Sequence, residues 1–150
     1  MRIAIVVAQF NDFVTSRLRD GARAQLRDAG VADDDVRVVD VPGAFEVPQM
    51  AKHLADTGNY DGVVCLGCLI RGETPHFDYI ASAVSHGIMN GAMESGVPMA
   101  FGVLTTNSVE EALERAGDGP SNKGREAAQA VIDMVRAYEG WRGPSGPAKS

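Results

Sequence analysis

The sequence lacks the long apolar run of a membrane protein and the positive charge of a typical nucleic-acid-binding protein. Its longest nearly unbroken apolar run, Val63–Ile70, has eight residues, whereas a membrane-spanning helix needs about 20. Among the 150 residues, 14 Lys and Arg stand against 20 Asp and Glu, which gives a net charge of −6. A global positive field is therefore excluded, although a local basic patch is not. We expect no membrane segment and no nucleic-acid partner.

Two other kinds of signal are also missing. The apolar stretch at the start of the chain is too short, before Gln9 and Asn11, for a secretory signal, so we expect a first strand there and a cytoplasmic protein. Neither G-x-G-x-x-G nor G-x-x-x-x-G-K-S/T occurs. The standard phosphate loops of dinucleotide-binding and nucleoside-triphosphate-binding proteins are therefore not supported.

Only two cysteines are present, and their C-x-x-C spacing raises the possibility of a redox or zinc site. Cys65 and Cys68 lie inside the apolar run that predicts a buried strand, where residues three apart point to opposite faces. A redox pair needs a helix N-terminus, and a zinc site needs two more ligands. We expect two inert core thiols and no metal site.

Hydrophobic residues make up 45% of the chain, enough for one globular domain. Apolar runs that predict strands alternate with stretches of helical spacing. Strands are expected at 2–8, 36–41, 62–70 and 99–104. Helices are expected from 14 until Gly30 ends them, from Pro48 to Gly58, after Thr74-Pro75, from the Ser108–Glu111 capping box to near Ala116, and after the loop Gly117–Asn122 to 138.

This alternation predicts an α/β protein, a three-layer α/β/α sandwich whose four-stranded parallel sheet is of flavodoxin-like type. Residues 1–139 are expected to form one domain, and residues 140–150 a frayed tail. In such sheets ligands bind beyond the carboxyl ends of the strands. The loops expected there carry aromatic rings, a carboxylate and a histidine, and they span 9–12, 42–46, 71–76 and 105–107. Their convergence predicts a binding site.

The loop that contains Gly72 and Thr74 favours phosphate binding. Gly72 lets the backbone approach a ligand, Thr74 can cap the following helix, and free amides at a helix start bind anions. A plain strand-to-helix turn explains the same residues equally well. His76 falls in the first helical turn, where the dipole favours a neutral imidazole that can transfer protons near neutral pH, although it could equally be a solvated residue.

Other candidates each have an ordinary structural explanation. Phe10 fits a stacking platform or the core, and Phe45 with Glu46 fits ligand binding or helix entry. Arg115 ends a helix, where a cation complements the dipole, and Lys123 could simply be solvated.

The same loops resemble the lumazine synthases, which form 6,7-dimethyl-8-ribityllumazine in riboflavin biosynthesis. The resembling stretches run in the expected order from about residue 3 to 138. They include V-A-Q-F-N-D at 7–12, G-A-F-E-V-P at 43–48, L-I-R-G-E-T-P-H-F-D-Y at 69–79, F-G-V-L-T at 101–105, E-R-A-G at 114–117 and N-K-G at 122–124.

The resemblance implies a transferase that needs no metal or other cofactor. It would condense 5-amino-6-(D-ribitylamino)uracil with 3,4-dihydroxy-2-butanone 4-phosphate through an imine, with release of phosphate and water. Family members form homopentamers with active sites between adjacent subunits, and some assemble twelve pentamers into a hollow shell of sixty subunits. An association with riboflavin synthase is also implied.

The resemblance assigns the site residues by position. Phe10 would stack on the pyrimidine, His76 would transfer protons, and Arg115 would anchor the phosphate. Phe101, Arg115 and Lys123 would come from the neighbouring subunit. The remaining assignments are Ala44, Phe45 and Glu46 to the ribityl chain, Cys68, Leu69 and Ile70 to the uracil, and Glu73 and Thr74 to the phosphate.

Two departures from the family pattern bear on these expectations. Glu73 places a carboxylate beside the expected phosphate, so its side chain must point away or pair with a cation such as Arg71. The chain also begins almost at its first strand, without the segment that some relatives add to a neighbour's sheet. That weakens the expectation of a shell, whereas the short Gly117–Asn122 connection permits one. Three other classes stay open: a non-catalytic flavin or lumazine binder, a scaffold protein and a flavodoxin-like electron carrier.

Overall fold

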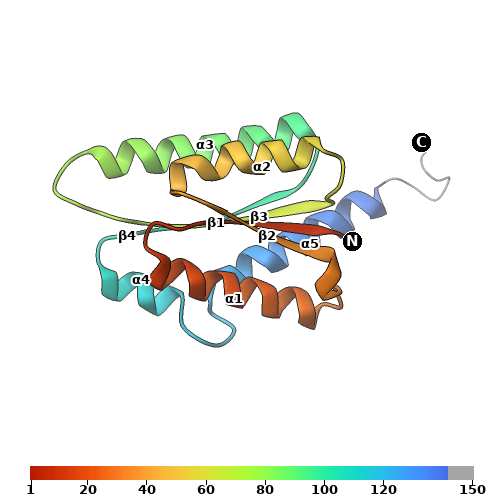
Figure 1. The fold of residues 1–150 in the computed structure, drawn as a ribbon, viewed down its shortest axis with the longest axis horizontal. Coiled ribbons are helices and arrows are strands. Elements are labelled where there is room, and N and C mark those ends of the chain that lie inside the picture. The colour runs from red at the N-terminus through yellow and green to blue at the C-terminus, as the bar shows by residue number, and fades with distance from the viewer. Residues whose placement is uncertain (142–150) are drawn as a thin grey trace.

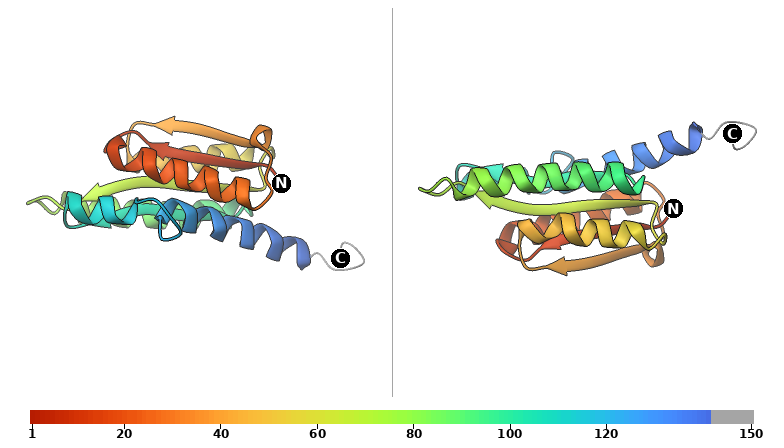
Figure 2. Two further views of the ribbon diagram at one scale, coloured as in Figure 1. Left: turned by 90° about the horizontal axis from the view of Figure 1, so that it is seen from below. Right: turned by 90° about the horizontal axis from the view of Figure 1, so that it is seen from above.

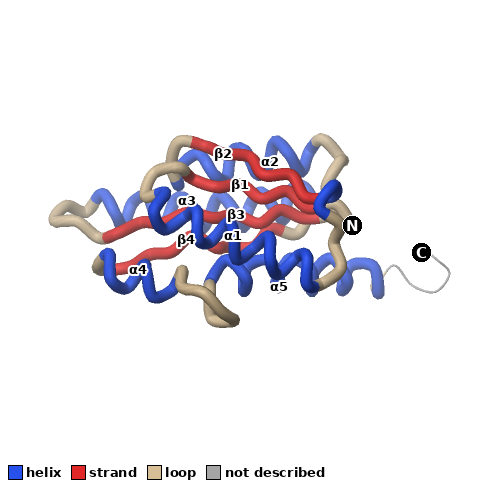
Figure 3. The backbone as a smooth tube through the Cα atoms, turned by 60° about the horizontal axis from the view of Figure 1, so that its bottom comes forward, coloured by secondary structure: helices blue, strands red, loops and turns tan. Residues whose placement is uncertain are grey.

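Four apolar segments pair side by side in one all-parallel sheet. The computed structural model describes residues 1–141. Its strands are β1 (Ile3–Ala8), β2 (Val36–Val41), β3 (Gly62–Ile70) and β4 (Met99–Thr106). Figure 3 shows them in the order β2-β1-β3-β4, so that β2 and β4 form the two edges. The predicted bounds of β2 and β3 are confirmed, and β4 continues two residues past the predicted end.

Helices cover both faces of this sheet. They are α1 (Asp12–Asp28), α2 (Val47–Asp56), α3 (His76–Ser95), α4 (Val109–Arg115) and α5 (Lys123–Gly140), with short 3-10 turns η1 (Asp33–Asp35) and η2 (Ala44–Glu46). Figure 1 shows α2 and α3 on one face and α1, α4 and α5 on the other, and Figure 2 shows each layer from its own side. The expected three-layer α/β/α sandwich is confirmed. No helix in residues 1–141 combines the length and the hydropathy that crossing a bilayer requires.

The sheet separates two cores, and β3 contributes to both. Cys65 packs in the core under α2 and α3, whereas Cys68 packs in the core under α1 and α5. Both thiols are free and buried, as expected for alternating residues of a central strand. Burial raises the pKa of Cys65 to about 12 and that of Cys68 to about 11, because it disfavours the thiolate. The prediction of core thiols is confirmed.

At the start of α4 and at the end of α5 the structure differs from the predicted signals. Ser108 Oγ accepts the Glu111 N–H at 3.1 Å, but Glu111 Oε1 accepts the Asn107 N–H at 2.6 Å, one residue before the N-cap. Gly140, which was assigned to the tail, belongs to α5 because the helix continues to Trp141, whose N–H reaches Ala137 O at 3.1 Å. The rest of the predicted tail, residues 142–150, lies outside the described residues.

Candidate active site

A cavity of about 520 Å³, here called the strand-end cavity, lies at the carboxyl ends of β1, β2 and β3. Three of the four predicted loops contribute to it. Its lining residues are Phe10, Asn11, Gly43, Ala44, Phe45, Glu46, Leu69, Ile70, Gly72, Thr74, His76, Phe77 and Ile80. The convergence predicted for four loops is therefore observed for three, and the loop 105–107 supplies no residue to this cavity.

The loop after β1 is held by hydrogen bonds that extend the sheet. The N–H groups of Gln9 and Phe10 donate to Val41 O at 2.8 Å and Pro42 O at 3.0 Å. Asn11 then adopts the left-handed conformation, with φ of 65°, which Asn tolerates better than most residues. Its Nδ2 donates to Cys68 O at 2.9 Å and so ties this loop to β3. The sequence analysis assigned Asn11 no role of its own, and its only signal was its place in the loop 9–12.

Two aromatic rings stand exposed at this cavity. Phe10 is 69% and Phe45 is 59% exposed, although both belong to loops that the backbone holds in place. Ala44, between Gly43 and Phe45, is buried, and its small side chain lines the cavity. Exposed rings on an ordered frame offer faces on which a flat heterocycle can stack.

The loop after β3 offers unused backbone donors. Within residues 1–141, no hydrogen bond engages the N–H groups of Gly72, Glu73 and Thr74. Thr74 Oγ1 accepts the His76 N–H at 3.4 Å, but the N-cap of α3 is Pro75 and not Thr74 as predicted, since Pro75 O accepts the first helical N–H, from Asp78. Free amides before a helix start are the donors that a phosphate needs.

The base of this loop is held by Arg71. Its guanidinium lies 4.5 Å from the ring centroid of Phe77 and 3.4 Å from Asp78 Oδ1. Its Nε also donates to Asn107 Oδ1 at 3.1 Å, which joins the loops after β3 and β4. Arg71 therefore pairs with Asp78 and not with Glu73. Glu73 is exposed and is not among the residues that line the strand-end cavity.

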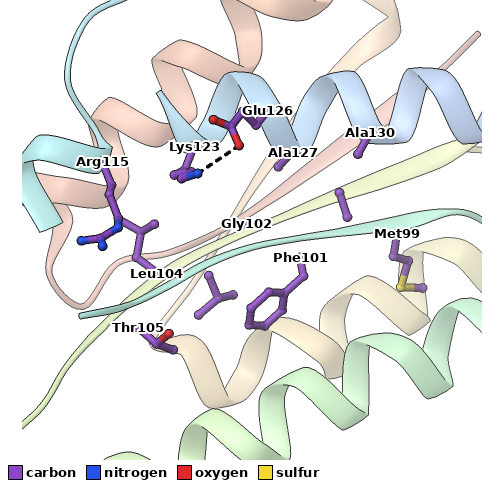
Figure 4. A pocket seen from close by; sticks show the side chains of 12 residues that line it. Met99, Phe101, Gly102, Leu104, Thr105, Arg115, Lys123, Glu126, Ala127 and Ala130 are labelled. Carbon is purple, nitrogen blue, oxygen red and sulfur yellow. Dashed lines mark hydrogen bonds and ion pairs between the residues drawn. The ribbon is translucent and has the colours of Figure 1, made fainter. Parts of the chain in front are cut away.

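A second cavity of about 530 Å³, here called the edge groove, lies on β4 and shares no lining residue with the first. Arg115 ends α4 and Lys123 begins α5, and both line it together with Phe101. Figure 4 shows the two cations on one side of β4 and the ring of Phe101 on the other. Lys123 Nζ lies 3.1 Å from Glu126 Oε1, and Arg115 Nη1 donates to Glu111 O at 3.4 Å.

The predicted site residues therefore fall into three sets. Most of the predicted binding residues, and His76, line the strand-end cavity. Phe101, Arg115 and Lys123 line the edge groove. Cys68 and Glu73 line neither, and the Cys68 side chain lies in the core on the α1 and α5 face. Within residues 1–141, no three His, Cys, Asp or Glu side chains gather as they would around a metal ion.

Comparison with known proteins agrees with this geometry. The model of the 6,7-dimethyl-8-ribityllumazine synthase family matches residues 1–139. A curated 6,7-dimethyl-8-ribityllumazine synthase from Syntrophus aciditrophicus is 51% identical over 135 residues, which cover 90% of this chain and 88% of that protein. Another, from Nitratidesulfovibrio vulgaris (strain DP4), is 48% identical over 139 residues, covering 93% and 89%. The chain belongs to the 6,7-dimethyl-8-ribityllumazine synthase family.

Proposed function

We propose that this chain catalyses the reaction for which its family is named, at a site built around the strand-end cavity. The enzyme condenses 5-amino-6-(D-ribitylamino)uracil with 3,4-dihydroxy-2-butanone 4-phosphate and releases phosphate and water. The observation that carries the proposal is the gathering of rings, free amides and His76 around one cavity. Holding two reactants together in this way can lower the barrier by about 7–11 kcal/mol.

The pyrimidine is assigned to the wall that carries the exposed rings. Phe10 would stack on it, while Leu69 and Ile70 at the end of β3 would contact its edge. Ala44, Phe45 and Glu46 would hold the ribityl chain. Cys68 would contribute only through its backbone, because its thiol lies in the core.

The phosphate is assigned to the loop that opens α3. The free N–H groups of Glu73 and Thr74 would donate to it, and the exposed Glu73 carboxylate would stay outside the cavity. His76, the first residue of α3, lines the same cavity and would transfer protons between the amine, the carbinol oxygen and water as the imine forms.

The edge groove is assigned to the site of a neighbouring copy. His76 and Arg115 line separate cavities, so one chain does not bring its proton-transfer group and its phosphate anchor together. A head-to-tail ring would place the edge groove of each subunit against the strand-end cavity of the next. The finer parts of the proposal are a ring of five subunits, a cytoplasmic location and an association with riboflavin synthase.

The first test mixes the purified protein with both substrates. Formation of lumazine, followed by its absorbance and fluorescence, should exceed the spontaneous rate and match phosphate release in amount. Tight binding of lumazine or riboflavin without enhanced formation would instead indicate a non-catalytic binding protein.

A second test addresses the shared site by mixing two impaired variants. Phe10→Ala/His76→Ala damages the strand-end cavity, and Arg115→Ala damages the edge groove. Unfolding and refolding the two together should restore activity, because about one interface in four of a mixed ring would join two intact halves. Activity no higher than that of the separately refolded variants would place the whole site within one chain.

A further inference from the structure

We propose that Asn122 is a positioning residue that holds Arg115 and Lys123 in a fixed relation to each other. This inference rests on the proposed function, in which Arg115 anchors the phosphate and Lys123 lines the same groove. Asn122 is only 4% exposed, one of three buried polar residues in the part of the chain that the structure describes. It lies in none of the cavity walls assigned to substrate.

The Asn122 side chain uses its full hydrogen-bonding capacity. Its Nδ2 donates to Gly117 O at 3.0 Å and to Arg17 O at 3.3 Å. Its Oδ1 accepts the N–H groups of Gly124 at 2.8 Å and Arg125 at 3.1 Å. One amide therefore joins the loop, α1 and the first turn of α5, with both donor hydrogens and both acceptor positions occupied.

These partners lie beside the two cations in sequence. Gly117 follows Arg115 by two residues, and Asn122 directly precedes Lys123. The four residues between Gly117 and Asn122 are all exposed. The bond from Nδ2 to Gly117 O closes this exposed loop at its base, so the end of α4 and the start of α5 are held together by one buried group.

Two glycines leave the room that this arrangement needs. A Cβ at Gly21 of α1 would overlap Asn122 Oδ1, and a Cβ at Gly124 would overlap Leu18 O. The close approach of α1 and α5 is therefore matched to the Asn122 side chain. Gly21→Ala is therefore a second way to displace the Asn122 side chain.

The test replaces Asn122 in ways that keep the helix cap but remove the bridge. In Asn122→Ser the hydroxyl can still cap α5 but is too short to reach Gly117 and Arg17. We expect the KM for the butanone phosphate to rise about tenfold, as for a misplaced binding group, with kcat and the KM for the pyrimidine within about twofold. Asn59→Ser, the same change at an exposed loop position, should leave all three constants unchanged.

Coupling to Arg115 separates positioning from a general loss of structure. If Asn122 acts through Arg115, adding Asn122→Ser to Arg115→Ala should raise the same KM much less than it does alone. Fully additive effects, or an equal loss in kcat and in both KM values, would overturn the proposal. If Asn122→Ser does not fold, Gly21→Ala should give the same pattern, and an unchanged KM in that folded variant would overturn it as well.

Direct binding of inorganic phosphate, measured by titration calorimetry, distinguishes this inference from the proposed function. Wild-type protein that binds phosphate but makes no lumazine would contradict the proposed function. The role of Asn122 would then be tested by comparing phosphate binding of wild type and Asn122→Ser. Asn122→Ser or Gly21→Ala protein that is folded and binds phosphate as tightly as wild type would contradict the role of Asn122.

Discussion

The strand-end cavity and the edge groove are similar in volume but are built in different ways. The cavity is formed by three loops, of which the loop after β1 is held by backbone hydrogen bonds, such as that from Phe10 N–H to Pro42 O, and the loop after β3 by the Arg71 side chain. The groove is formed on one edge strand, and its charged side chains come from the ends of α4 and α5. The strand-end cavity supplies a defined shape and directed backbone donors, whereas the edge groove supplies positive charge.

The two regions also differ in the hydrogen bonds and ion pairs that a bound ligand would displace. The free amides of Gly72, Glu73 and Thr74 have no partner to lose among residues 1–141. Lys123, in contrast, is paired with Glu126 at 3.1 Å on the surface, a contact of the kind that contributes about 0–1 kcal/mol. Displacing this weak pair would therefore cost an anion bound in the groove little.

The largest effect is expected from removing the anchor of the edge groove. Arg115→Ala should lower kcat/KM roughly 100-fold, on the scale of a charged hydrogen bond of about 1.5–3 kcal/mol, mainly through the KM for the butanone phosphate. Steady-state kinetics with each substrate varied in turn would measure this.

Arg23→Ala, which removes an exposed arginine of α1, is the matched control and should leave kcat/KM unchanged. An Arg115→Ala enzyme with an unaltered KM for the phosphate substrate would remove the groove from the site.

A smaller effect is expected from the proton-transfer group of the strand-end cavity. His76→Ala should slow kcat about tenfold without abolishing it, less than the roughly 10²–10⁴-fold typical of general acid–base catalysis, because His76 is exposed and water can replace it. Rates measured as a function of pH would show whether the profile changes. His53→Ala, on α2, is the control, and full activity in His76→Ala would refute the assigned role.

The smallest effect on activity is expected from Cys68, whose side chain lies in the core and lines neither cavity. Cys68→Ala should lower the free energy of unfolding by about 1 kcal/mol and change neither KM by more than about twofold. Chemical denaturation and kinetics would measure the two quantities separately. A large change in the KM for the pyrimidine would contradict the core position of this thiol.

The pH dependence of stability offers a check on the same residue. Burial raises the pKa of Cys68 to about 11, whereas an unfolded thiol ionises near 8.5. The stabilising contribution of the neutral thiol is therefore present below about pH 8.5 and is lost as the pH rises toward 11. Cys68→Ala should lose less stability than wild type over this range.

The sequence predicted the sheet well because the strands have a distinctive pattern. In β3, seven successive residues are fully buried, which produces an apolar run without alternation, and the bounds at Gly62 and Ile70 were predicted correctly. The convergence of loops at one sheet edge followed from the parallel topology alone.

The contacts of individual side chains were less predictable. Glu73 was expected either to point away from the phosphate or to pair with a cation such as Arg71. The Arg71 guanidinium instead lies over the Phe77 ring and pairs with Asp78. Position along the chain alone did not give the division of the candidate residues between two cavities, since it does not reveal which edge of a sheet a helix end will face. Only the family resemblance set Phe101, Arg115 and Lys123 apart from the other candidates. In the sequence Asn122 looks like an ordinary loop residue. One of its hydrogen bonds goes to Arg17 O, which is 105 residues away in sequence and is brought close only by the fold.

The placement of β1 between β2 and β3 has a consequence for synthesis of the chain. All six residues of Ile3–Ala8 are apolar and buried, yet their second neighbouring strand ends only at Ile70. Translation of the roughly 60 intervening residues takes about 3–12 s at 5–20 residues per second. During that interval one edge of a β-prone apolar segment has no native partner, and unpaired strand edges of this kind are prone to aggregation.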